Sequence, residues 1–336
     1  VALAALSNPE TEDYISSGGK IIVPALTWST SVYPILDIGC VPVFVDSNKK
    51  TLNLDNSLIG KAIDNDTHAI VAVHLIGNPC ALDELREIAD DHNLFLVEDC
   101  CEAHGAEFKN KKVGSYGEFG TFSFFFSHHI TTIEGGMIVT NDNNLADMCR
   151  CLRAHGWTRH LKERERIEKQ YPERDPRFLF INRGYNFRPT DLQGAFGNHQ
   201  LRKLDNFVDV RRRCASVISD KLIQEGAQVG LQMEQPDGKH SWFGFPLILQ
   251  ESSWENRAKV IRSLEKASVE TRPIMSGNMA DQPAMKLFKH EVREPLSVAR
   301  RIDVSGLFVG LNQNMTDEEA NELANRIIIS LNERGV

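Results

Sequence analysis

Two adjacent histidines, His128 and His129, stand near the end of an aromatic run and are suited to moving protons. The run starts at Gly120 and closes on Gly135-Gly136, a pattern that indicates a strand followed by a tight polar turn. Imidazole changes its charge near neutral pH, so a histidine here can act as a general base and acid. Neighbouring side chains on an extended segment point to opposite sides, so the two rings are not expected to share one metal ion.

A second candidate is the acidic pair Glu98-Asp99, which follows the apolar residues Leu94 to Val97. A carboxylate at the carboxyl end of a buried strand lies at the edge where open α/β sheets bind ligands. It can hold a proton on a heterocyclic nitrogen, or it can cap the next helix. Ser123 can donate to a phosphate or bond to its own backbone. The residues alone leave these alternatives open.

The seven cysteines lack the spacing of a metal site or a disulfide framework. Cys100-Cys101 and the pair around residue 150 have no second pair nearby. His74 and His104 are further possible ligands, but no spacing motif joins them. We therefore expect no metal site, and reduced thiols in a cytoplasmic protein.

Alternating apolar and amphipathic stretches must position these side chains. The apolar runs are continuous, which indicates strands buried on both faces and a mainly parallel sheet. Strands are predicted over residues 21–23, 41–45, 69–73, 94–97, 121–125 and 137–139. Helices are predicted over 29–38, 82–92 and 144–152. This order predicts an α/β sandwich.

The last third of the chain reads as a separate α+β unit. A strand is predicted over 242–249, an amphipathic helix over 254–266, and a last helix after the capping box of Thr316 and Glu319. Before them, residues 191–222 form one long helix or two joined helices.

The chain of 336 residues is long enough for two domains, predicted at 1–205 and 206–336. The charged residues 160–177 are expected to form a surface insertion. The net charge of −8 does not indicate a nucleic-acid partner, and without a run of 18 apolar residues we expect no membrane span. Val1 to Leu6 resemble the tail of a helix, so we expect further residues upstream.

Six sequence blocks together carry a specific signal: Val-Pro-Ala-Leu-Thr-Trp at 23–28, Pro-Val-Phe-Val-Asp at 42–46, and the residues 73–79, 98–105, 123–136 and 184–193. With these blocks in order, the chain from Gly19 onward resembles the DegT/DnrJ/EryC1/StrS family of vitamin B6-dependent sugar enzymes. The resemblance implies the aspartate aminotransferase-like fold type I. Its large domain is an α/β/α sandwich, and its C-terminal domain is a small α+β unit.

The resemblance also implies a role for each candidate residue toward a pyridoxal or pyridoxamine 5′-phosphate cofactor. Asp99 pairs with the pyridine nitrogen, and Trp28 stacks on the ring. Glu102 lies beside the cofactor, and Ser123 contacts its phosphate. Asn186 reaches the phosphate of the neighbouring subunit, which implies a homodimer with shared active sites. Outside this resemblance, Trp28 reads as a core residue and Asn186 as a turn residue.

The position of His128 separates the chain from aminotransferases of the family. In those enzymes the lysine that binds the cofactor covalently follows the serine by five positions, and counting from Ser123 leads to His128. This replacement resembles the 3-dehydratases that make 3,6-dideoxysugars, and Glu102 suits the same branch. Imidazole cannot form the lysine's covalent link, so we expect His128 to remove a proton at the cofactor and then assist the departing C3 hydroxyl. His129 is expected to pack or to support the turn.

Two branches of such dehydratases are known, and one carries an iron–sulfur cluster. Residues 152–186, where its cysteines fall, contain no cysteine here, so we expect no iron–sulfur cluster. The other branch recovers pyridoxamine phosphate with glutamate and acts on GDP-4-keto-6-deoxymannose. The expected partners are therefore a nucleotide sugar and glutamate.

Two other functions stay open. A sugar aminotransferase requires a lysine in the turn after Ser123, whereas the nearest lysines, within residues 109–112, precede the strand. A non-catalytic relative is the second alternative. It has no need to keep Trp28, Asp99, Ser123 and Asn186 together.

Overall fold

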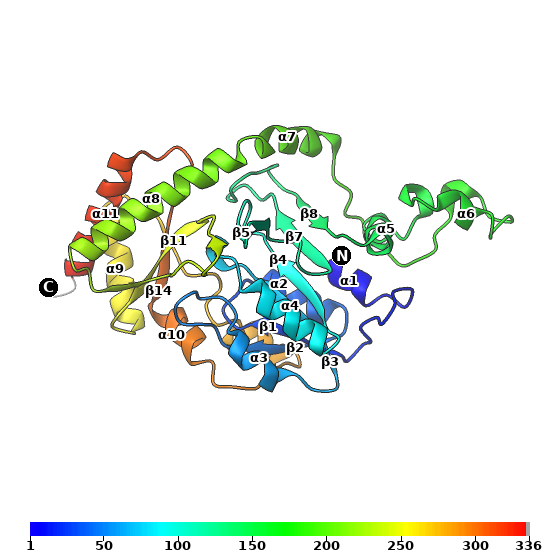
Figure 1. The fold of residues 1–336 in the computed structure, drawn as a ribbon, viewed down its shortest axis with the longest axis horizontal. Helices are drawn as coiled ribbons and strands as arrows, with labels where there is room; N and C mark the ends of the chain where they lie inside the picture. Colours follow the sequence, from blue (N-terminus) through cyan, green and yellow to red (C-terminus); the bar gives the residue numbers. More distant parts are fainter. Residues whose placement is uncertain (334–336) are drawn as a thin grey trace.

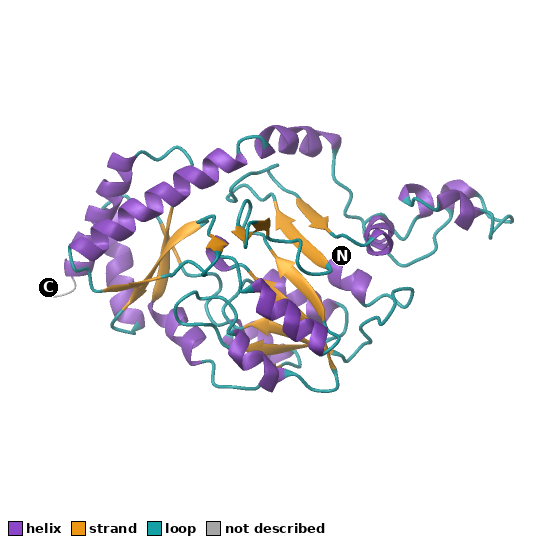
Figure 2. Cartoon of the chain, viewed as in Figure 1, coloured by secondary structure: helices purple, strands orange, loops and turns teal. Residues whose placement is uncertain are grey.

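A seven-stranded sheet crosses the middle of the computed structural model, which describes residues 1–333 (Figures 1 and 2). The strand order is β13-β2-β1-β3-β4-β7-β8, and all neighbours are parallel except the antiparallel pair β7 and β8. The strands are Lys20–Pro24 (β1), Val41–Val45 (β2), Thr67–Val73 (β3), Phe95–Asp99 (β4), Phe119–Ser123 (β7), Gly136–Val139 (β8) and Glu291–Val292 (β13).

Helices cover both faces of this sheet, because successive strand side chains point to opposite sides. Ile21 and Val23 belong to one buried cluster, and Ile22 between them belongs to the other. The first cluster receives α1 (Ala2–Leu6), α2 (Ser29–Asp37), α5 (Asn143–Leu152) and α10 (Ser297–Ser305). The second receives α3 (Asn56–Ala62) and α4 (Leu82–Asp91). The expected α/β/α sandwich is confirmed.

A third buried cluster gathers residues between Cys214 and Leu331. It packs α8 (Leu204–Gln224), α9 (Trp254–Lys266) and α11 (Asp317–Asn332) on a four-stranded antiparallel sheet. Its strands are β9 (Val229–Leu231), β11 (Gly244–Leu249), β12 (Thr271–Arg272) and β14 (Gly306–Gly310). This is the α+β arrangement expected for the last third, while the boundary at residue 205 stays a prediction. A small sheet joins β5 (Glu107–Phe108), β6 (Lys111–Lys112) and β10 (Gly238–Lys239).

All predicted strands and helices are present, with shifted ends. The strand predicted to start at Trp242 begins at Gly244, because Trp242 has a left-handed backbone with φ of 51°. The strand predicted over 121–125 ends at Ser123, where the polar turn begins. Residues 191–222 contain two helices, α7 (Asp191–Leu201) and α8, which together run along one side of the molecule (Figure 1).

The charged insertion predicted at 160–177 is confirmed as a surface feature. It carries α6 (Arg164–Glu168) and projects from the body of the molecule (Figure 1). Its base is fixed by Trp157, whose ring stacks with those of Phe178 and Phe180 at centroid distances of 5.9 and 5.7 Å. Within residues 1–333, none of the helices has the length and apolarity needed to cross a membrane.

Candidate functional site

Asp99 ends β4, beside the centre of the large sheet, and its carboxylate is held on both oxygens. Oδ2 accepts a hydrogen bond of 2.7 Å from the hydroxyl of Ser31, and Oδ1 accepts one of 3.1 Å from the backbone N–H of Cys101. Ser31 comes from the first turn of α2, which follows β1. The neighbouring strand β7 places Thr121 directly opposite Asp99. The carboxylate is therefore oriented before any ligand binds.

The cavity in front of Asp99 has a volume of about 1150 Å³. Residues of the sheet, α2, α5 and α7 line it, and Val71 and Val97 form an apolar part of its wall. Arg150, Arg153 and Arg188 also line it; Arg150 is paired with Asp147, so Arg153 and Arg188 are the main source of positive charge for an anionic ligand. A cavity of this size, mostly apolar with a few fixed polar groups, is typical of a small-molecule site.

His128 lies in the turn after β7, close enough to Asp99 for the carboxylate to affect its titration. Burial lowers the pKa of His128 to about 4, and the charge of Asp99 opposes that effect. The ring packs against Phe243, with centroids 5.3 Å apart. Its Nδ1 atom is buried and has no hydrogen-bond partner within residues 1–333. The imidazole is therefore neutral near pH 7, as a general base requires.

His129 differs from His128 in burial and in bonding. It is 2% exposed, and its Nε2 atom lies 3.0 Å from the backbone oxygen of Ser241. Burial, together with the charge of Arg211, holds its pKa well below the ordinary value. The expectation that His129 packs and supports the turn agrees with this position.

Glu102 is a buried carboxyl group behind Asp99. It is 8% exposed, and Oε2 accepts a hydrogen bond of 2.8 Å from the backbone N–H of Ile76. Burial raises the pKa of Glu102 to about 8, and the negative charge of Asp99 adds to the rise. At neutral pH the group is mainly protonated, so it can donate as well as accept a hydrogen bond.

The other three predicted residues are half-buried or exposed. Trp28 is 51% exposed at the start of α2, so it is not a core residue. Ser123 is half-buried on β7, where its oxygen accepts a bond of 3.3 Å from the backbone N–H of Phe125. Asn186 is exposed, and its side-chain oxygen accepts bonds from Arg188. The structure thus places Asp99 close enough to Glu102 and to His128 for its charge to act on both, and of the six predicted residues Asp99 lines the cavity.

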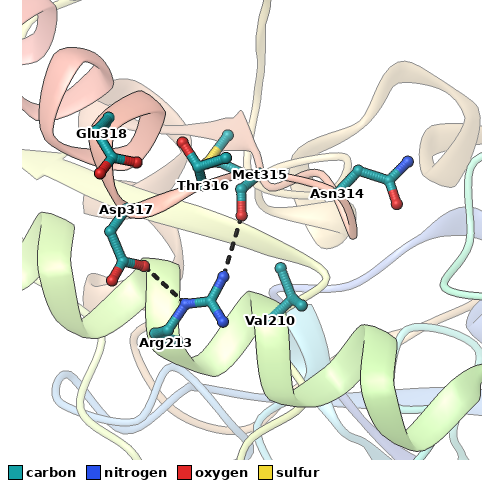
Figure 3. A pocket seen from close by; sticks show the side chains of 7 residues that line it. All are labelled: Val210, Arg213, Asn314, Met315, Thr316, Asp317 and Glu318. Carbon is teal, nitrogen blue, oxygen red and sulfur yellow. Dashed lines mark hydrogen bonds and ion pairs between the residues drawn. The ribbon is translucent and has the colours of Figure 1, made fainter.

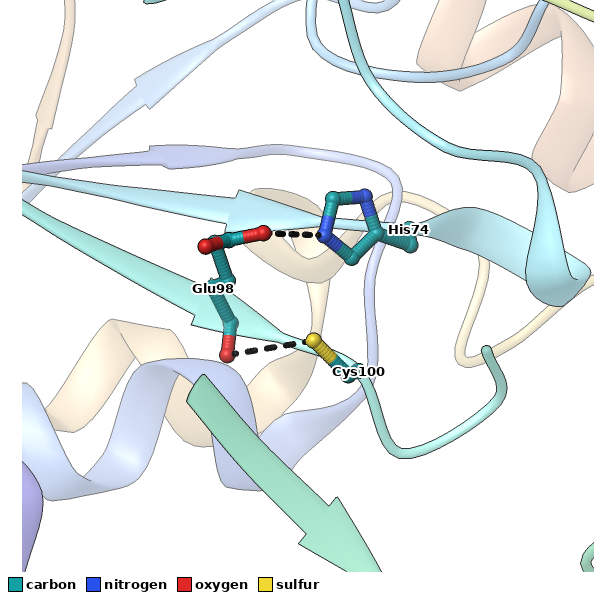
Figure 4. A group of neighbouring side chains, drawn as sticks. All are labelled: His74, Glu98 and Cys100. Carbon is teal, nitrogen blue, oxygen red and sulfur yellow. Dashed lines mark hydrogen bonds and ion pairs between the residues drawn. The ribbon is translucent and has the colours of Figure 1, made fainter. Parts of the chain in front are cut away.

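A possible metal cluster is formed by His74, Glu98 and Cys100, all buried (Figure 4). The Glu98 carboxylate is already bonded to Nε2 of His74 at 3.2 Å and to the backbone N–H groups of Gly114, Tyr116 and Gly117. Burial alone would raise the pKa of Glu98. His74 and the backbone N–H groups lower it by more, so the pKa of Glu98 lies below its usual value. These bonds tie the ends of β3 and β4 to the 114–117 turn, which is a structural role.

A second hollow, of about 340 Å³, lies between α8 and α11 (Figure 3). Within it, Arg213 donates 2.7 Å to the Asp317 carboxylate and 3.3 Å to the Met315 carbonyl. These contacts hold the two helices together. The hollow is therefore interpreted as part of the packing between α8 and α11 and not as a ligand site.

Several residues at the site carry no sequence signal that reveals them. Ser31 stands in an ordinary helix start, and nothing local links it to Asp99. Arg211 on α8 is 4% exposed and donates to the carbonyls of Trp242 and Phe243 at 3.2 and 2.9 Å. Phe243, which is distant from His128 in the sequence, packs against its ring. Only the folded chain brings these partners together.

The chain is similar to curated enzymes over most of its length. GDP-4-keto-6-deoxy-D-mannose 3-dehydratase of Yersinia pseudotuberculosis is 42% identical over 311 residues, which is 92% of this chain and 78% of that enzyme. A solved structure of the Escherichia coli GDP-4-keto-6-deoxy-D-mannose-3-dehydratase with bound hydrated PLP matches with a TM-score of 0.89 and 38% identity, covering 97% of this chain and 83% of that one.

A further structure of GDP-4-keto-6-deoxymannose-3-dehydratase holds a trapped PLP–glutamate geminal diamine. It matches equally well, with a TM-score of 0.89, 38% identity and coverage of 97% of this chain and 84% of that one. These likenesses confirm the expected fold. The model of the DegT/DnrJ/EryC1/StrS aminotransferase family matches residues 3–328. With nearly the whole chain matched, the protein belongs to the DegT/DnrJ/EryC1/StrS aminotransferase family.

Proposed function

We propose that this protein is a 3-dehydratase that removes the C3 hydroxyl of a nucleotide-linked 4-keto-6-deoxyhexose, with GDP-4-keto-6-deoxymannose as the first candidate substrate. The observation that carries the proposal is His128, a neutral imidazole beside Asp99 at the position where aminotransferases of the family have lysine. The 42% identity to the Yersinia 3-dehydratase supports the choice of substrate.

The residues of the cavity fit a pyridoxamine phosphate cofactor. Asp99 offers a carboxylate fixed by Ser31, which suits a protonated pyridine nitrogen. Arg153 and Arg188 offer positive charge to phosphate groups. When bound, the cofactor supplies an amine that condenses with the C4 ketone and a ring that draws electrons from the reacting carbons.

Each side chain of the site then has a separate role. Asp99 holds the proton on the ring nitrogen, and Trp28 covers the ring from its exposed position at the start of α2. His128 removes a proton from the C4′ carbon of the cofactor and gives it to the departing C3 hydroxyl. Glu102, mainly protonated, stays beside the cofactor without adding a full negative charge. Ser123 contacts the phosphate.

A homodimer with shared active sites completes the proposal. Large apolar side chains are exposed around α7 and the neighbouring turns, which favours burial against a second copy of the chain. They are Phe126, Ile133, Met137, Phe187, Leu192, Phe196 and Leu201. Exposed Asn186 would then reach the phosphate in the partner's site. Glutamate is the proposed amino donor, supported by the glutamate adduct in the related structure, and the cytoplasm is the proposed location.

The reaction is tested by incubating the protein with pyridoxamine phosphate, glutamate and a panel of 4-keto-6-deoxysugar nucleotides. Mass spectrometry of the products should show loss of the C3 oxygen and no amino group on the sugar. Gain of an amino group would make the protein an aminotransferase. An unchanged panel would favour a non-catalytic relative.

Shared sites are tested by mixing two inactive variants, His128→Asn and Asn186→Ala. In a mixed dimer, one site receives both defects and the other receives neither. Exchange should therefore restore about a quarter of wild-type activity, because half of the dimers are mixed and each has one intact site. If each site is built from one chain, no activity returns.

A further inference from the structure

Three histidine rings meet on the inner side of the His128 turn. The ring centroid of His104 lies 6.1 Å from that of His128 and 5.8 Å from that of His129. The ring of Phe243 packs against those of His128 and His129, with centroids 5.3 and 6.0 Å apart. His104 is only 3% exposed, and it comes from the loop after β4 that also carries Glu102.

His104 is unusual because neither ring nitrogen has a hydrogen-bond partner within residues 1–333, although both are buried. The Nδ1 atom of His128 is also buried without a partner, whereas His129 is anchored through its Nε2 atom to Ser241. A buried polar atom without a partner destabilises the folded state, so native proteins rarely keep such atoms without a purpose. Here they belong to three neighbouring rings, because the Nδ1 atom of His129 is also buried without a partner within residues 1–333, and His104 has two such atoms.

We propose that His104 is a positioning residue for His128, and that the two imidazoles share one small hydroxylic ligand, such as water, between His104 and Nδ1 of His128. This inference rests on the proposed dehydratase function, in which His128 is the base. A general base needs its second nitrogen held so that the first one has the correct tautomer. Nδ1 would carry the proton, and Nε2 would be free to receive one.

Within residues 1–333, the carboxylate and the rings recorded beside His128 give its Nδ1 atom no hydrogen bond. Asp99 accepts from Ser31 and from the backbone of Cys101 but makes no hydrogen bond to Nδ1 of His128, and the rings of Phe125 and Phe243 are apolar. The ring separation of 6.1 Å exceeds that of a direct contact but suits one bridging oxygen with two bonds of about 2.8 Å.

The charges around the cluster keep His104 neutral and available. Burial, and then the charge that His128 acquires, lower the pKa of His104 to about 3. The charge of Asp99 raises the pKa of His128, and the charge of Arg211 lowers the pKa of His129. A neutral His104 can accept a hydrogen bond from the bridging ligand while His128 is protonated. Its removal should therefore destabilise the protonated form of His128 and lower its pKa.

Nuclear magnetic resonance of the wild-type protein, with ¹⁵N-labelled histidine and His128→Asn for assignment, gives the first test. We expect His128 to be the Nδ1–H tautomer above its pKa. The Nε2–H tautomer would overturn the proposal. This measurement needs no substrate, so it decides the role of His104 even if the protein proves not to be a dehydratase.

The second test compares His104→Phe, which keeps the aromatic packing, with His104→Gln, which keeps a hydrogen-bonding amide. In His104→Phe the pKa of His128 should fall by about one unit, and kcat should fall about tenfold while KM stays within about twofold. The acid limb of the kcat profile should move with that pKa. His104→Gln should recover most of kcat. Equal losses in both variants, or an unchanged titration of His128 in either, would overturn the proposal.

Discussion

The hydroxyl of Ser31 donates a 2.7 Å hydrogen bond to Oδ2 of Asp99, and so joins the first turn of α2 to the end of β4. Together with the bond from the backbone N–H of Cys101, it fixes the orientation of the carboxylate. In Ser31→Ala we expect cofactor affinity to fall about tenfold, the equivalent of one hydrogen bond to a charged group. Titration of cofactor absorbance measures the change. The control is Ser29→Ala, two positions earlier, and an equal loss there would assign the effect to the helix start instead.

Replacement of His128 by lysine should abolish most of the dehydration and allow covalent binding of the cofactor. The lysine amine can bind the aldehyde cofactor covalently, whereas the general base is lost. We expect dehydration to fall by about 10²–10⁴-fold. Borohydride reduction followed by peptide mass spectrometry should find the cofactor on residue 128.

The matched comparison for that variant is His129→Gln. Because His129 is anchored to Ser241, its replacement should lower stability more than it lowers kcat. If dehydration survives in His128→Lys and is lost in a folded His129→Gln protein, the roles of the two histidines are exchanged.

Glu102 should make the protein less stable as the pH rises. Its pKa, about 8 mainly because of burial, exceeds the ordinary value, so the folded state keeps a proton that the unfolded chain loses. Stability therefore declines between about pH 4.5 and 8. Glu102→Gln removes this decline, so its melting temperature should gain on the wild type from pH 5 to pH 8. Exposed Glu87→Gln is the control, and a constant difference across the range would show that Glu102 does not titrate in this window.

Arg211 should stabilise the segment that covers His128. Its buried guanidinium, whose pKa burial lowers to about 10, donates to the carbonyls of Trp242 and Phe243. Arg211→Met leaves these oxygens unpaired, which costs about 1–3 kcal/mol each. We expect a lower melting temperature and a lower kcat, with Arg211→Lys intermediate.

Arg213→Met, on the same helix, removes an exposed ion pair with Asp317 and a 3.3 Å hydrogen bond to the Met315 carbonyl, and it should destabilise the protein less than Arg211→Met, by about 1 kcal/mol. Equal effects of the two arginine replacements would contradict the role of Arg211 in stabilising the segment that covers His128.

The sequence was sufficient for the layers and for the placement of Asp99. Continuous apolar runs marked the buried strands, and an acidic residue at the end of such a run had to lie at the ligand edge of a parallel sheet. The turn between β7 and β8 was also predictable from its polar residues and from Gly135-Gly136, although β7 ends at Ser123 and not at residue 125.

The supports of the site were not predictable in the same way. Ser31 meets Asp99, and Phe243 meets His128, across separations in the chain that periodicity does not encode. His104 was only a possible metal ligand until its unpaired nitrogens were located beside His128. Trp242 was predicted to lie in a strand, but local propensity gives no sign of the left-handed backbone that the packing of this segment imposes.

The pairing of β13 with β2 has a consequence for synthesis of the protein. Glu291 lies beside Val43, and the backbone N–H groups of Val298 and Ala299 bind the carboxylate of Asp46. On the ribosome, β2 emerges early, and its outer edge cannot be covered until residue 292 has left the exit tunnel. Unpaired strand edges invite association with other chains. The nascent polypeptide should therefore depend on chaperones until its last helices have been translated.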